Sequence, residues 1–166
     1  MYGDDEIMDT MDQEDGGAAR MSESELLKGL IEAGTGKDSK DSYERIQIRR
    51  KGKLFFEFRI RPISEEESVE CREKATKFAP RKRGQPKREI ETNAAKFRSW
   101  LIYTATVDED RAKTWDSKEA QDALNVLTGV DMIEAVLLAG EKDQVIDRIN
   151  EISGYGEEAL ETAKNS

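Results

Sequence analysis

Residues 42–62, SYERIQIRRKGKLFFEFRIRP, decide the fold because their pattern predicts a β-hairpin over residues 43–61. Apolar and polar residues alternate on both sides of Gly52, as is typical of two half-buried strands. The apolar positions are Ile46, Ile48, Leu54, Phe56, Phe58 and Ile60. Pairing Ile48 with Phe56 places both on one face and implies a loop of odd length centred on Gly52. Since a two-stranded hairpin is marginal alone, helices or further strands must cover this face.

The same register brings like charges together on the polar face of the hairpin. It sets Gln47 opposite Glu57 and Arg45 opposite Arg59, and two facing arginines are unfavourable in isolation. A nearby carboxylate, either Glu44 or one on a partner, would offset their repulsion.

An amphipathic helix is predicted before the hairpin. A capping box at Ser22 and Glu25 begins it, and Gly34 and Gly36 end it. Its apolar face must dock on the protein's own body or on a partner, because so short a helix is not stable alone. The residues of this face are Leu26, Leu27, Leu30 and Ile31.

Helix signals also fill the chain after the hairpin. A capping box opened by Ser64 begins a helix that is expected to reach about Lys77. Between residues 92 and 153 the pattern predicts a lobe of four short helices. The first of these, capped by Asn93, is expected to be the central helix packed on the hairpin. The spacing of Trp100 on this helix favours a core position over a partner contact.

The later helices of the lobe are expected to begin at Asp116, at Asp131 and after Gly140, which ends the third helix. The residues expected to face inward are Ala120, Leu124, Leu127, Ile133, Val136, Leu137, Val145, Ile146, Ile149 and Ile152. Together with the hairpin, these elements predict an α+β fold, in which one antiparallel β-hairpin packs against five or six short helices and the termini are disordered.

The charge of the chain is concentrated at its start. The 166 residues carry a net charge of −9, and residues 1–20 hold seven acids and one base. Such a segment is typical of a disordered tail, which either keeps a protein soluble or attracts a basic partner. We predict a disordered tail over 1–20, an amphipathic helix and linker over 21–40, a main domain over 41–155 and a flexible tail over 156–166.

Composition removes the commonest catalytic and metal-binding groups. The chain has no histidine and one cysteine, Cys71, which excludes an internal disulfide and the common Cys/His zinc sites. Gly34-Thr35-Gly36-Lys37 resembles a phosphate-binding loop, but Asp38 stands where that motif requires serine or threonine. We therefore predict no catalytic, cofactor-binding or metal-binding residues, no cofactor and no enzymatic activity. The chain has no apolar run of about 18 residues and no secretion signal, which predicts a cytoplasmic protein without a membrane span.

A basic loop is the one feature that suggests nucleic acid. Residues 79–88, APRKRGQPKR, include Arg81, Lys82 and Arg83, and two prolines and a glycine exclude regular structure. Such a patch suits phosphates, and it suits an acidic protein segment or the chain's own acidic tail equally well. No aromatic residues interleave with these bases, which argues against single-stranded nucleic acid as the ligand.

Three stretches carry a resemblance to a known family. They are residues 42–62, residues 98–106 (RSWLIYTAT) and residues 137–155 (LLAGEKDQVIDRINEISGY). In these stretches the chain resembles the XkdN-like tail assembly chaperones of phages and defective prophages with contractile tails. It departs from that pattern at Ala139, where relatives often have proline, and at residues 107–110, where several have a Pro-Leu-aspartate turn.

The resemblance implies a non-enzymatic chaperone of the host-cell cytoplasm that is absent from the finished virion. Such a protein would bind the tape measure protein, keep it soluble while tail tube subunits are recruited, and possess a capacity for self-association. The residues that we predict to bind partners are Leu26, Leu27, Leu30, Ile31, Arg81, Lys82, Arg83 and Trp100. The alternative function is that of a prophage nucleic-acid-binding or regulatory protein that uses the loop 81–88. A structural protein of the virion is a third alternative.

Overall fold

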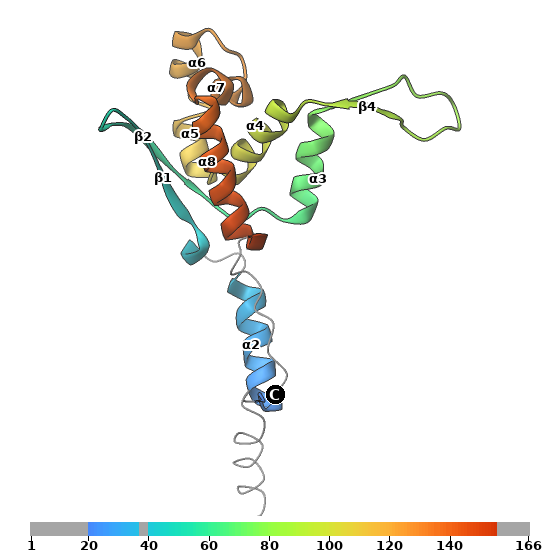
Figure 1. Ribbon diagram of the computed structural model, residues 1–166, viewed down its shortest axis with the longest axis vertical. Coiled ribbons are helices and arrows are strands. Elements are labelled where there is room, and N and C mark those ends of the chain that lie inside the picture. The colour runs from blue at the N-terminus through green and yellow to red at the C-terminus, as the bar shows by residue number, and fades with distance from the viewer. Residues whose placement is uncertain (1–19, 37–39, 156–166) are drawn as a thin grey trace, which may run out of the picture. The chain divides into compact units, whose positions relative to one another are not determined.

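The computed structural model describes residues 20–36 and 40–155 (Figure 1). Apart from Arg20, the tail predicted over 1–20 lies outside these residues, and so does the tail predicted over 156–166. The helix before the hairpin and the segment Lys40–Gly156 belong to two different compact units and are described in turn. The predicted domain boundaries stay predictions.

Helix α2 spans Glu23–Gly36 and begins as the sequence predicts. The backbone N–H of Glu25 donates to Ser22 Oγ at 3.3 Å, and the N–H of Ser22 donates to the Glu25 carboxylate at 3.4 Å. This reciprocal pair satisfies two N–H groups that a helix start would otherwise leave without partners. No residue of α2 is buried.

The second unit opens with a 3₁₀ turn, Lys40–Ser42, and the predicted hairpin, β1 (Glu44–Arg50) and β2 (Lys53–Ile60). The predicted register is confirmed, because Ile48 pairs with Phe56 and Ile46 with Phe58. Gln47 lies opposite Glu57 and donates to its carboxylate at 3.1 Å.

The loop of the hairpin differs from the prediction. It has two residues, Lys51 and Gly52, both with positive φ (52° and 79°), as a tight primed turn requires. A bulge restores the register, since Arg49 pairs with Leu54 while Ile48 pairs with Phe56, which leaves Phe55 as the extra residue. Leu54 is therefore displaced from the core face and is 40% exposed.

Of the two facing arginines of the hairpin, Arg59 is neutralised by the helical lobe. Arg59 donates to Asp110 at 2.9 Å and to Glu109 at 3.0 Å. Both acids belong to α5 (Asp108–Lys113), so this ion pair fixes α5 to β2. Glu44, which we considered for this role, pairs instead with Arg148 at 2.6 Å.

After Pro62, helix α3 spans Glu65–Lys74 with the predicted capping box. The prediction that this helix reaches Lys77 is wrong. The chain turns at Ala75, and β3 (Thr76–Phe78) pairs antiparallel with β4 (Glu89–Thr92). The hydroxyl groups of Thr76 and Thr92 lie 2.8 Å apart across this pair. Contacts between residues far apart in the sequence stabilise the two strands, so local helix propensity does not reveal them.

Five further helices form the lobe that covers the hairpin (Figure 1). They are α4 (Ala94–Ala105), α5, α6 (Lys118–Leu124), α7 (Gly129–Val136) and α8 (Ala139–Asn150), with a π-helical turn at Glu151–Tyr155. Helix α4 contacts α3, α7 and α8, so it has the central place that the sequence predicts. The α+β fold is confirmed, with seven α-helices and a second strand pair among the described residues.

The core lies between the hairpin and the lobe. Its buried members are Ile48, Phe58, Ile60, Ile102, Ala105, Trp115, Met132, Ile133, Leu137, Val145 and Ile149. Trp115 is 1% exposed, and its ring lies 5.2 Å from that of Phe58 and 5.7 Å from that of Phe56. Edge-to-face aromatic contacts of this kind bury a large apolar area at the hairpin surface.

Several inward positions of the lobe are predicted correctly, whereas two are wrong. Leu124 and Leu127 are 50% and 91% exposed, because α6 ends at Leu124 and Asn125 adopts a left-handed conformation. Val126 packs on the core in their place.

The helix boundaries near α7 also differ from the prediction. Helix α7 begins at Gly129 with Thr128 as its cap, two residues before Asp131. Gly140 lies in the first turn of α8 and does not end the preceding helix.

Candidate partner-binding site

The apolar face of α2 is the first candidate. Leu26, Leu27, Leu30 and Ile31 are 54%, 60%, 72% and 56% exposed. Residues at these spacings share one side of a helix. An exposed row of large apolar side chains is the usual mark of a surface that a partner covers.

Acidic residues outnumber basic ones on α2. Glu23 and Glu25 lie in the first turn of α2, and Glu32 lies in its second half. Lys28 is the one basic residue of the helix. The net charge of α2 is therefore −2. Glu23 precedes Leu26 by three residues and Leu27 by four, so it lies on their side of the helix.

The basic loop lies at the end of the arm that β3 and β4 form, which Figure 1 shows extending from the helices. Arg81, Lys82 and Arg83 are exposed. No ion pair among the described residues joins any of the three to a carboxylate. The loop therefore presents uncompensated positive charge. Phe78 at its base is covered by Lys87, whose Nζ lies 5.3 Å from the ring.

Trp100 lies outside the buried core, so the core interpretation is wrong for this tryptophan. It is half-buried on α4, with the Nζ of Lys74 4.5 Å above its ring and Tyr103 edge-on at 5.8 Å. These contacts hold Trp100 at the surface of the lobe. Neither of these contacts involves a base of the loop, so the structure gives Trp100 and the loop no shared site.

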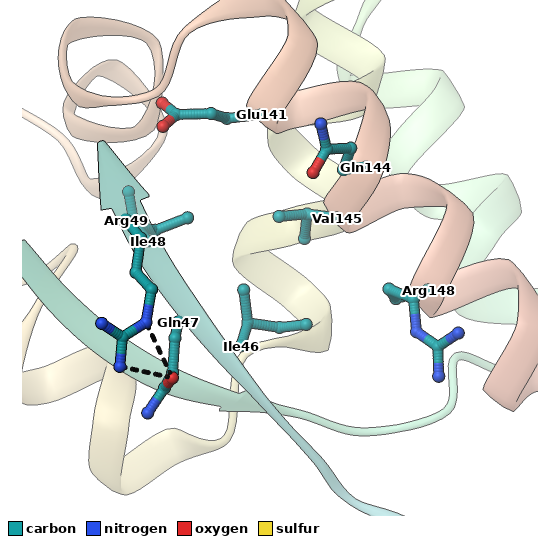
Figure 2. A pocket seen from close by; sticks show the side chains of 8 residues that line it. All are labelled: Ile46, Gln47, Ile48, Arg49, Glu141, Gln144, Val145 and Arg148. Atoms are coloured by element: carbon teal, nitrogen blue, oxygen red, sulfur yellow. Dashed lines mark hydrogen bonds between the residues drawn. The ribbon is translucent and has the colours of Figure 1, made fainter. Parts of the chain in front are cut away.

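A shallow groove of about 190 Å³ separates β1 from α8 (Figure 2). Ile46, Ile48 and Val145 form its apolar part, and Gln144 and Arg148 of α8 face the strand across it. Ligand pockets for small molecules usually measure about 300–1,000 Å³, so this groove suits a peptide side chain better than a small cofactor. No backbone hydrogen bond joins the outer edge of β1 to another element in the part of the chain that the structure describes.

The described residues offer no arrangement typical of an enzyme or a metal site. No group of three or more histidine, cysteine, aspartate or glutamate side chains among them is placed to hold a metal ion. Cys71 is buried, and its burial raises the pKa of the thiol, which disfavours the reactive thiolate. None of the described helices is long and apolar enough to span a membrane.

The C-terminal motif, residues 137–155, connects α8 to both ends of the hairpin. Glu141 accepts hydrogen bonds from Arg50 at 2.7 Å and from the N–H of Leu138 at 2.8 Å. Its pKa is lowered chiefly by the Arg50 guanidinium. Ser153 accepts from the N–H of Ile63 at 2.9 Å, just beyond the end of β2, and Gly154 then ends the helix with φ of 97°. Glu141, Ser153 and Gly154 of this motif thus have defined structural roles.

The comparison with known families agrees with this geometry. The model of the family described as "Phage XkdN-like tail assembly chaperone protein, TAC" matches residues 21–165. The chain belongs to this family. Its members are phage tail assembly chaperones, which makes proteins of the phage tail the expected class of partner.

Other comparisons add little to the XkdN-like assignment. No curated protein sequence matches the chain. A crystal structure of the protein yqbn is similar to it at 18% identity, with 69% of this chain and 87% of that chain covered and a TM-score of 0.44.

The structure of this XkdN-like chaperone also reveals a surface that sequence reasoning missed. We call it the hairpin-tip surface, and it consists of Arg49, Arg50, Lys51, Lys53, Leu54 and Phe55. The bulge exposes Phe55 (52%) beside the basic turn. A sequence signal existed: seven residues separate Ile48 from Phe56, and a two-residue turn between them requires one unpaired residue.

Proposed function

We propose that this chaperone binds the tape measure protein of the phage tail and keeps it soluble in the host cytoplasm while tail tube subunits are recruited. It acts without catalysis and does not remain in the finished virion. The observation that carries this proposal is the exposed apolar face of α2, on a chain whose family consists of tail assembly chaperones.

The physical reason is the match between two kinds of apolar surface. The resemblance implies a long, helical tape measure protein, and its apolar helical surface aggregates when it is bare. An amphipathic helix covers an apolar helical surface through side chains three and four positions apart, the spacing that Leu26, Leu27, Leu30 and Ile31 have. Full burial of one such side chain contributes about 1.5–3 kcal/mol, so a few of them in each copy stabilise a complex.

Co-expression with the tape measure protein that the neighbouring gene encodes tests the proposal. The wild type should yield a soluble complex with several copies of the chaperone for each tape measure protein, measured by pull-down and light scattering. The double variant Leu27→Gln/Leu30→Gln should leave the tape measure protein insoluble, since glutamine maintains the helix but removes the apolar contact.

A matched control lies on the other side of α2. Lys28→Gln/Glu32→Gln also places two glutamines on the helix without changing the net charge, and should preserve the soluble complex. A tape measure protein that stays insoluble with the wild type, or that Leu27→Gln/Leu30→Gln solubilises equally well, would overturn the proposal.

One observation favours a second function, anion binding by the loop 81–88. Its bases are exposed and lack carboxylate partners among the described residues. Such charge binds polyanions with a strong dependence on salt concentration. A salt-dependent shift of labelled RNA or DNA, lost when Arg81, Lys82 and Arg83 are neutralised, would support a nucleic-acid-binding role.

A further inference from the structure

The outer edge of β1 is a strand edge without a backbone partner among the described residues. The groove beside α8 runs next to this edge, because it is lined by four consecutive residues of β1, 46–49, and by none of β2. Neighbouring residues of a strand point to opposite faces, so a groove that all four line follows the edge and not one face. An open edge with its N–H and C=O groups unpaired is a template for a further strand.

Two ion pairs hold α8 beside this edge, one at each end of β1. Arg148 binds Glu44 at 2.6 Å, and Glu141 binds Arg50 at 2.7 Å. The seven residues of β1 span about 20 Å, and along this length Gln144 of α8 faces the strand (Figure 2). The ion pairs thus fix the groove between strand and helix before a partner arrives, which lowers the entropic cost of binding.

The side chains along the edge define which strand would fit. Ile46 and Ile48 line the groove together with Val145 of α8, so the groove side is apolar. Arg45 and Arg49 are exposed, and no ion pair among the described residues joins either of them to a carboxylate. Opposite charges on neighbouring strands stabilise their pairing, so the edge favours an acidic strand.

We propose that this edge binds an extended segment of another protein, which adds to the hairpin as a third strand. The segment carries acidic residues four positions apart, opposite Arg45 and Arg49, and apolar residues between them that enter the groove. Main-chain hydrogen bonds supply affinity in this mode of binding, and the alternate side chains supply specificity. The inference goes beyond the proposed function, because it involves neither α2 nor the tape measure protein.

The same arginines disfavour two other occupants. If β1 paired antiparallel with β1 of a second copy about Gln47, Arg45 of each copy would face Arg49 of the other, and facing like charges are destabilising. A single-stranded nucleic acid would bring phosphates to the arginines, but none of the described residues that line the groove is aromatic, so its bases would have no ring to stack on.

A synthetic peptide with the matching pattern tests the inference. The acetylated and amidated peptide GEVTVEG reads the same in both directions, so it fits parallel and antiparallel pairing alike. Added to the ¹⁵N-labelled full chain, it should shift the NMR amide signals of residues 44–50 and 141–148 and slow the exchange of the edge amide protons of β1. The peptide GKVTVKG should bind at least about tenfold more weakly, because two favourable cross-strand pairs become unfavourable.

Variants of the chain locate the peptide. Arg45→Glu/Arg49→Glu should reverse the preference, so that GKVTVKG binds about tenfold more tightly than GEVTVEG. Lys28→Glu/Lys118→Glu makes the same change in net charge at exposed positions elsewhere and should keep the wild-type preference. Gln144→Trp should fill the groove and abolish binding of both peptides.

A matched control for the groove lies on the same helix. Asn150→Trp also places an indole at an exposed position of α8, but it does not line the groove, so it should bind GEVTVEG like the wild type. Unchanged signal dispersion in the NMR spectrum of each variant shows that its fold is retained.

Four results would overturn the inference. The first is a wild type whose β1 signals GEVTVEG does not shift at millimolar concentration. The second is equal binding of the two peptides, which would show that the arginines do not select the strand. The third is wild-type binding by Gln144→Trp, which would place the peptide outside the groove. The fourth is an oligonucleotide or a second copy of the chain that occupies β1 in preference to the peptide.

Discussion

Trp115 donates its indole N–H to the hydroxyl oxygen of Thr106 at 3.0 Å, and both side chains are buried. The Thr106 hydroxyl in turn donates to the carbonyl oxygen of Ile102 at 2.6 Å. Thr106 also forms the β-bridge to Ile60 at the end of the hairpin. This buried chain of hydrogen bonds therefore joins the largest core side chain, helix α4 and strand β2.

Replacing the Thr106 hydroxyl should destabilise the fold by leaving the indole N–H without a partner. Thr106→Val keeps the shape of the side chain and should lower the free energy of unfolding by about 1–3 kcal/mol. Thr106→Ser keeps the hydroxyl group and should cost less. Urea denaturation followed by tryptophan fluorescence measures both. An equal or greater loss for Thr106→Ser would contradict this account of the bond.

Gly129 is required where α7 approaches α4. A β-carbon at this position would lie closer than 3.0 Å to the ring of Tyr103 and to the carboxylate of Asp116. These two groups are hydrogen-bonded to each other at 2.9 Å, so neither moves without breaking their contact. Gly129→Ala should therefore destabilise the protein by about 1–3 kcal/mol through overpacking.

Gly140 provides the matched control for Gly129. A β-carbon at Gly140 would meet nothing within 4 Å, and the residue lies in the first turn of α8. Gly140→Ala should stabilise the protein by about 0.4–1 kcal/mol, since alanine restricts the unfolded chain. Thermal unfolding of the two variants should move in opposite directions. Movement in the same direction would show that the close approach at Gly129 does not control stability.

Local signals in the sequence were sufficient for most of the fold. Alternating residues set the register of the hairpin, and the caps at Ser22, Ser64 and Asn93 marked three helix starts, because each effect acts within a few residues. The β3–β4 pair was missed because its partners are separated by a loop of ten residues. Trp115 was missed because its burial depends on the distant ring of Phe58.

The candidate surfaces also divide into those that local sequence pattern predicted and one that it did not. The apolar face of α2 and the basic loop were found from local pattern, and both are exposed in the structure. The hairpin-tip surface was not found, because the bulge that exposes Phe55 follows from the turn type and the register together. Trp100 was assigned to the core from its helical spacing, which does not say how far a neighbouring helix covers that side.

The capping box of α3 should make stability depend on pH in the acidic range. Arg61 donates to Glu67 at 2.6 Å and, with the N–H of Ser64, lowers the pKa of Glu67 to about 2. The unfolded value is about 4.3, so the charged carboxylate stabilises the fold fully above that pH. This contribution is lost as the pH falls from about 4.3 through about 2.

Glu67→Gln should therefore reduce stability at pH 7 by on the order of 1.5 kcal/mol, the usual contribution of a hydrogen bond to a charged group. The difference between wild type and variant should shrink as the pH falls through about 2. Chemical denaturation at several pH values measures it. Glu66→Gln, at an exposed position of the same turn, serves as the control. A difference that does not depend on pH would show that the Arg61–Glu67 pair is not the cause.

Neutralising the basic loop should change anion binding without changing stability. Arg81→Gln/Lys82→Gln/Arg83→Gln alters exposed side chains, so the free energy of unfolding should stay within about 0.5 kcal/mol of the wild type for each substitution. Binding to a heparin column or to labelled RNA should weaken, and its dependence on salt should decrease, because each lost phosphate contact lowers the salt slope by about 0.7–0.9. Lys28→Gln/Lys113→Gln/Lys118→Gln makes the same change in net charge at other exposed positions. If this second variant weakens binding equally, overall charge governs the binding. If the second variant still binds like the wild type while the loop variant does not, the anion site lies on the arm.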